Sequence, residues 1–405
     1  MMDIEKIVGN NIQLKMAENN VSITDLAKEL DVTRQTLTNY LKGTSIIDSV
    51  KLRKVAEYFS MELEDFFVAQ NQVKKYNLLF RTSLNEDESK AAVQECVIDY
   101  VKTYTELIDL LGECSTVFPP SYSLYTTYNN KGYNINKDIQ DYTTFPSSLS
   151  GELCSQIELI AAEQRKVLNA ENMTGLDLIN AIVESGVHVF FIDFGIDTIS
   201  GVSAVDERSG CYIFVNCHNS ISLERQIFTV AHEYGHILMH RPLYRANNTK
   251  LLSKKYSART ILDRMADEFA GYFLCPRQMI SLYSNILQNT RKYSDLFPIK
   301  HKFQISLSAL MMSLKKYGYI SPMALNSYFD FLRRENLEKV EKSPISEVPF
   351  VIEKYNQTKN YAINRKIQLL VMNPKTNDDD VYEIVEGSEF ENTYLDYLKQ
   401  KTINQ

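Results

Sequence analysis

Residues 1–70 carry apolar side chains at helical spacing, which predicts a domain of short helices. Ser22 is suited to cap one helix and Thr33 the next, because their hydroxyls can accept a hydrogen bond from a free amide at a helix start. The second helix is expected to run through Lys42 and to end at Gly43. The pattern therefore predicts two helices joined by a tight turn.

The second of these helices has one apolar and one polar face. Leu37, Tyr40 and Leu41 fall at positions i, i+3 and i+4, so they face the core. The outward positions carry side chains that can reach base edges or phosphates. We expect the DNA contacts to come from Arg34, Gln35, Thr36, Thr38, Asn39 and Lys42.

The order of these pieces resembles the Xre/Cro-like helix-turn-helix family from about Val8 to Phe67. The matching pieces are Leu26-Ala27, Val32-Thr33, Leu37, Tyr40-Leu41-Lys42-Gly43 and Leu52-x-x-Val55-Ala56. The resemblance implies a five-helix domain that binds operator DNA, usually as a homodimer. Residues 1–70 hold eight basic and eleven acidic side chains, a net charge of −3, which weakens nonspecific DNA affinity. The alternative is a helix-turn-helix fold used only for dimerisation or protein contacts.

The chain changes character after this domain. Residues 71–149 are expected to form a connector with little core of its own: a helix from about Glu86 to Leu111, then a segment rich in Tyr, Asn, Ser and Pro. Residues 150–335 return to a clear pattern of helices and strands. Residues 336–405 are expected to be a small α/β region, in which Lys366–Met372 and Val381–Val385 pair as a hairpin.

The pattern over residues 150–335 predicts an α+β domain. Buried strands are expected at 187–192, 203–205 and 212–215. Helices are expected at 152–167, 175–185, 222–240, 260–274, 306–317 and 322–336. The helices near 222–240 and 260–274 carry the residues with the clearest chemistry.

The sharpest motif is Ala231-His232-Glu233-Tyr234-Gly235-His236. On a helix, His232 and His236 lie one turn apart and project in nearly the same direction, so their imidazoles can bind one zinc ion. Glu233 follows the first histidine and can face the open position beside the metal. There it would take a proton from the attacking water and pass it to the leaving amine.

A catalytic zinc site needs a third protein ligand. Asp263, at the edge of the apolar stripe of the next helix, is the best candidate. Asp267 lies one turn later on the same side and could hydrogen-bond a ligand histidine. His240 is about 12 Å along the helix from His232, too far to share the ion, and is interpreted as a supporting or helix-end residue. Glu268 projects away from this face and is the weaker ligand candidate.

Both motif helices resemble the ImmA/IrrE metallopeptidases. The resemblance rests on the segments Phe228–His240, Asp263–Ala270 and Phe273-Leu274-Cys275-Pro276, and it extends over about residues 150–335. It implies a zincin-like fold, a histidine pair at His232 and His236, a catalytic Glu233, and a protein substrate, typically a partner repressor. The family's third ligand is normally glutamate, so Asp263 is a departure, one methylene shorter.

Composition narrows the remaining possibilities. The six cysteines form no C-x-x-C pair, and the N-terminus has no signal-peptide pattern, so a cytoplasmic protein without a membrane partner is expected. The fold class expected is multi-domain: an all-α helix-turn-helix domain, an α+β zincin-like metallopeptidase domain and the small C-terminal region. The expected function is a DNA-binding regulator with a zinc endopeptidase, one zinc per chain, that cleaves a repressor. The alternative is a regulator whose peptidase-like domain is a non-catalytic ligand or metal sensor.

Overall fold

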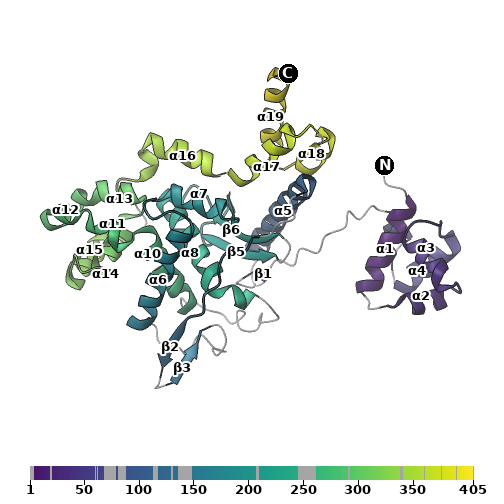
Figure 1. Cartoon of the computed structure of the whole chain (residues 1–405), viewed down its shortest axis with the longest axis horizontal. Helices are drawn as coiled ribbons and strands as arrows, with labels where there is room; N and C mark the ends of the chain where they lie inside the picture. The colour runs from purple at the N-terminus through teal and green to yellow at the C-terminus, as the bar shows by residue number, and fades with distance from the viewer. Residues whose placement is uncertain are drawn as a thin grey trace. The chain divides into compact units, whose positions relative to one another are not determined.

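The computed structural model describes residues 4–18, 21–59, 61, 63–67, 79–80, 88–112, 117–128, 131–135, 148–206, 209–244, 261–290, 292–337, 341–359, 361–374, 376–388 and 390–404. The chain divides into two compact units, Met1–Tyr76 and Asn77–Gln405. Figure 1 shows the elements of each unit, and each unit is considered by itself.

The first unit is helical. It contains α1 (Ile4–Glu18), α2 (Ile23–Glu29), α3 (Arg34–Leu41), α4 (Ser49–Phe59) and the 3₁₀ helix η1 (Leu63–Phe66). The predicted caps are present, because the hydroxyls of Ser22 and Thr33 accept hydrogen bonds from the amides of Asp25 and Thr36. The second helix ends one residue earlier than expected, with Lys42 as its C-cap.

Close contact between α1 and the end of α3 fixes the first unit. A Cβ atom at Gly9 would lie 2.5 Å from the carbonyl oxygens of both Tyr40 and Leu41, so only glycine permits this approach. The apolar core beneath it includes Ile12, Leu26, Leu37, Val55 and Phe66. The expected helix-turn-helix geometry is confirmed.

The second unit is built around a four-stranded sheet in the order β1-β5-β6-β4. Its strands are β1 (Leu79–Phe80), β4 (His188–Ile192), β5 (Gly201–Asp206) and β6 (Gly210–Asn216). Strand β4 runs parallel to β6, whereas β5 is antiparallel to both β6 and β1. A separate hairpin joins β2 (Tyr125–Tyr128) to β3 (Lys131–Asn134).

Helices surround this sheet and extend beyond it (Figure 1). On one side lie α6 (Gly151–Val167), α7 (Leu176–Glu184), α8 (Leu223–His240) and α10 (Ile261–Leu274). Shorter helices follow: η2 (Arg241–Tyr244), α11 (Arg277–Ser281), α12 (Ser284–Asn289), η3 (Tyr293–Leu296), α13 (Phe297–Phe303), α14 (Leu307–Lys316), α15 (Pro322–Arg334) and η4 (Ile345–Glu347).

The sheet buries both faces. Val189, Phe191 and Ile213 belong to the main core with α8 and α10. The alternate residues, among them Phe190 and Tyr212, stack with one another on the opposite face. That opposite face is covered by α5 (Glu88–Leu111), whose Tyr100 and Tyr104 meet Phe190 at ring-centroid distances of 5.9 and 5.3 Å.

The expectation that residues 71–149 have little core is therefore wrong for the described parts of this segment. Helix α5 buries Val93, Val97, Val101 and Leu107 as part of the second unit. Leu124 and Ile135, which directly precede β2 and follow β3, belong to the main core. A sheet that is apolar on both faces needs a second covering layer, and α5 supplies it.

The predicted C-terminal hairpin is also wrong. Residues 366–372 and 381–385 lie in helices α17 (Tyr361–Met372) and α18 (Asp378–Val385), which are flanked by α16 (Pro349–Lys359) and α19 (Glu391–Asn404). Ile363, Ile367, Leu370 and Val371 are buried at helical spacing. The acidic run before Val381 opens α18, where carboxylates are stabilised by the helix dipole.

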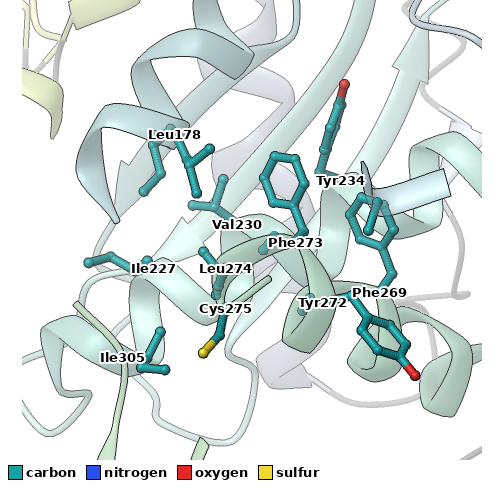
Figure 2. Packing of buried hydrophobic residues seen from close by; sticks show 14 of the residues in the cluster. Leu178, Ile227, Val230, Tyr234, Phe269, Tyr272, Phe273, Leu274, Cys275 and Ile305 are labelled. Atoms are coloured by element: carbon teal, nitrogen blue, oxygen red, sulfur yellow. The ribbon is translucent and has the colours of Figure 1, made fainter. Parts of the chain in front are cut away.

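The main core joins α8, α10 and the long helix α6. Figure 2 shows Tyr234 of α8 beside Phe269 and Phe273 of α10, with Val230 and Ile227 continuing the apolar row. The buried Arg165 of α6 donates to the carbonyl oxygen of Phe273, 2.6 Å away, and so ties α6 to the end of α10. None of the helices in the described ranges is long and apolar enough to cross a membrane.

The histidine at the start of β4 predicts a pH-dependent stability. Burial against Tyr104 and Tyr212 lowers the pKa of His188 to about 4, and its Nε2–H donates to the carbonyl oxygen of Ser209. The unfolded chain binds this proton near pH 6.5, so the contribution of His188 to stability is complete above pH 6.5 and is lost as the pH falls toward 4. In His188→Gln, the free energy of unfolding should fall less between pH 6.5 and 4 than in the original chain, as measured by urea titration. Parallel pH profiles would contradict this assignment.

Candidate metal centre

Helix α8 places the motif residues in the interior of the second unit. Ser222 caps the helix through its hydroxyl, which accepts from the amide of Arg225. His236 is fully buried and Glu233 is 3% exposed. Tyr234, on the opposite side, packs in the core and donates its hydroxyl to Gln164, which agrees with the packing role that the sequence favours. The motif thus divides one helix between a polar cluster and an apolar core.

Helix α10 packs closely on α8 beside the histidines. A Cβ at Gly235 of α8 would lie 2.8 Å from Cδ1 of Phe269 on α10, and Ala266 and Ala270 of α10 are fully buried small residues. Asp263, on the same helix α10, places its Oδ1 3.5 Å from Nε2 of His236. The close packing of the two helices thus suits a ligand with a short side chain.

Three side chains bring donor atoms close together. His232, His236 and Asp263 each offer one, and all three lie within 4.8 Å of one another. The Nε2 atoms of the two histidines are 3.1 Å apart, and Nε2 of His236 is 3.5 Å from Oδ1 of Asp263. Ligands at about 2.0–2.1 Å from a tetrahedral zinc ion stand about 3.3 Å from each other. The donor set and its spacing therefore fit zinc.

Two further side chains orient the histidines. Oδ1 of Asp267 lies 2.9 Å from Nδ1 of His232, and Nδ1 of His240 lies 2.7 Å from Nδ1 of His236. These contacts use the Nδ1 atom of each histidine and leave Nε2 directed at the cluster. Such partners fix the tautomer and ring orientation of a metal ligand.

Glu233 has a partner that the sequence did not reveal. The hydroxyl of Ser203 on β5 donates to Oε2 of Glu233 at 2.5 Å and lies 2.8 Å from the hydroxyl of Tyr244 on η2. Strand β5 can come this close to α8 because Gly201 has no side chain. A Cβ atom at Gly201 would overlap Cγ2 of Thr229. Ser203 was recognised only as a strand residue, since its facing depends on how β5 packs on α8.

Other predicted residues lie away from the cluster. Glu268 pairs with Lys316 at 3.0 Å, in agreement with its rank as the weaker ligand candidate. The ring centroid of Tyr272 lies 3.9 Å from the ammonium nitrogen of Lys316, and Tyr256 lies outside the described residues. Asn216 is buried and bonds to the backbone of the loop after β4, so its contacts are structural.

A cavity of about 620 Å³ opens beside the cluster. Asp267 and Phe228 line its side near His232, and its other lining residues include Glu268, Lys316, several serines and the apolar Met312 and Leu332. None of the three candidate ligands is among its lining residues. The cavity is thus adjacent to the metal cluster, and Asp267, which contacts His232, lies between the two.

The predicted DNA contacts lie on the surface of α3 and at its end. Arg34, Gln35 and Lys42 are exposed, and Thr36, Thr38 and Asn39 are half-buried. The side-chain amide of Gln35 donates to Oδ1 of Asn39 at 3.3 Å. This places the two amides next to each other on the outward face.

Comparisons with known families match both units. Residues 12–66 match the model described as Helix-turn-helix. Residues 183–315 match a peptidase family model described as IrrE N-terminal-like domain. The chain joins a helix-turn-helix domain to an IrrE-like domain. A search of curated proteins finds no match.

The IrrE-like match covers the strands β4, β5 and β6 and the helices α8 and α10, which together hold the whole metal cluster. Helices α5 and α6 lie outside the matched range, as do the helices from α15 onward. The family match thus covers the centre of the second unit and does not extend to these flanking helices.

The close contact at Gly235 yields a testable prediction. In Gly235→Ala the added methyl meets the buried ring of Phe269, so α10 and Asp263 must move away from the histidines. We expect zinc affinity to fall about tenfold or more. The gain of helix propensity, about 1 kcal/mol, should not restore it.

Gly151→Ala is the matched control, because a Cβ at Gly151 meets nothing within 4 Å. Zinc affinity can be measured by competition with a chromogenic chelator. Equal affinities in the two variants would show that the approach of α8 and α10 does not set the site.

Proposed function

We propose that the chain is a transcription regulator whose IrrE-like domain is a zinc endopeptidase that cuts a repressor or another regulatory protein. The cluster of His232, His236 and Asp263 beside a buried, hydrogen-bonded Glu233 carries this proposal. A purely structural zinc site normally has four protein ligands, whereas three ligands and an adjacent carboxylate are typical of catalysis.

The roles of the residues follow from their positions. His232, His236 and Asp263 would hold the ion, and Asp267 and His240 would keep the imidazoles in place. Zinc supplies a Lewis acid that makes water nucleophilic at neutral pH. Glu233 would accept the proton of that water and return it to the leaving amine. Ser203 holds one carboxylate oxygen, so the glutamate keeps a fixed orientation toward the site.

The helix-turn-helix domain would bring this activity to DNA. The outward face of α3 presents Arg34, Gln35 and Asn39, side chains that can form bidentate hydrogen bonds with bases. Lys42 at the end of the helix suits a phosphate. We expect this domain, which matches a helix-turn-helix model, to bind operator DNA, and to do so as a homodimer.

The cavity beside Asp267 favours one alternative function. At about 620 Å³ it falls within the usual size of small-molecule sites. A ligand there would lie next to the support of His232, so the IrrE-like domain could act as a sensor without turnover. The two functions differ in one respect: cleavage of a regulatory protein needs Glu233, whereas regulation by a non-catalytic sensor does not.

A cellular comparison of Glu233→Gln with the original chain tests the proposal. With the original chain, quantitative proteomics should show one regulatory protein falling in abundance and a matching fragment appearing. In Glu233→Gln the fragment should be absent while zinc content stays unchanged, because glutamine cannot accept the proton.

Glu268→Gln is the matched control, since Glu268 pairs with Lys316 and not with the cluster. It should behave like the original chain. Identical protein levels and identical promoter output in all three strains, with no fragment in any, would rule out the peptidase function. That result would leave the sensor.

A further inference from the structure

Strand β1 occupies the outer edge of the sheet in the second unit. The sheet order β1-β5-β6-β4 makes β5 the last long strand, and β1 covers its free side. The pairing is antiparallel, with Leu79 opposite Val205 and Phe80 opposite Ala204. A segment at the very start of this unit thus lies along β5.

The covered strand is the one nearest the metal cluster. Ser203, next to Ala204, donates to Glu233, and Gly201 packs directly on α8. The backbone of β5 is therefore fixed relative to Glu233. Any extended chain that pairs with the free side of β5 is guided past the cluster.

Peptide recognition often uses such an edge. An extended peptide adds as a strand, and main-chain hydrogen bonds supply affinity while side-chain pockets supply specificity. An endopeptidase substrate must be extended at the cut, so β5 is the edge that suits it. Strand β1 already holds that edge.

We propose that β1 is an internal competitor for the substrate: Leu79–Phe80 occupies the β5 edge, and a substrate pairs there only after β1 has left. This inference rests on the proposed peptidase function. The pairing of β1 with β5 is short enough for a substrate to displace β1. Strand β1 pairs through two residues, whereas β5 pairs with β6 through six.

Two variants of the full-length, zinc-loaded protein test the competition. Leu79→Pro/Phe80→Pro removes both backbone N–H donors of β1, so the strand cannot pair as before. Leu79→Ala/Phe80→Ala keeps those donors and is the matched control. Thermal melting of both variants checks that the rest of the unit stays folded.

Two ligands probe the site without turnover. One is the hydroxamate of the tripeptide Leu-Leu-Phe, which copies residues 78–80 and is long enough to pair with β5. The other is acetohydroxamate, which reaches a metal but is too short to pair with a strand. We expect the tripeptide to bind about tenfold more tightly to the proline variant than to the alanine control, about 1.4 kcal/mol. Acetohydroxamate should bind both equally.

Hydrogen exchange provides a readout that needs no metal. The amides of Ala204 and Val205, the two residues opposite β1, should exchange faster in the proline variant than in the alanine control. Equal tripeptide affinities, or unchanged exchange in this strand, would overturn the proposal. So would cleavage of the original chain within β1 that depends on Glu233, because β1 would then be a substrate. If acetohydroxamate binds neither variant, the zinc function fails, and the exchange experiment still decides whether β1 covers β5.

Discussion

The contact between α8 and α10 is the constraint on which the metal centre depends. Gly235 has no side chain, so the ring of Phe269 lies against the backbone of α8. The two helices are thereby close enough for the short Asp263 to reach the histidine pair. Packing and coordination are thus one feature of the fold.

Much of the centre could be predicted from the sequence. His232 and His236 lie four residues apart on an apolar helix, which fixes their common direction, and Asp263 lies at the edge of the next apolar stripe. The partner of Glu233 is harder to predict than those of the histidines, because it depends on a tertiary contact between a strand and the helix. Ser203 and Tyr244 come from a strand and a short helix, and only the packing of β5 on α8 brings them to Glu233.

Two predictions outside the centre were wrong: the connector with little core and the C-terminal hairpin. The strands carry apolar residues at consecutive positions, such as Phe190 and Phe191, which means that both sheet faces are covered. This pattern required a second layer, and α5 provides it. In the C-terminal region Ile363 and Ile367 already have helical spacing. The hairpin interpretation failed because short apolar runs fit either period when taken alone.

Metal analysis of the purified full-length protein tests the central claim most directly. After loading with zinc and dialysis, mass spectrometry of the metal should find about one zinc per chain, because the described residues hold one cluster of three donors. The ion should be lost in Asp263→Ala and retained in Glu268→Ala, since only Asp263 belongs to the cluster. A full complement of zinc in Asp263→Ala, or none in the original chain, would contradict the account.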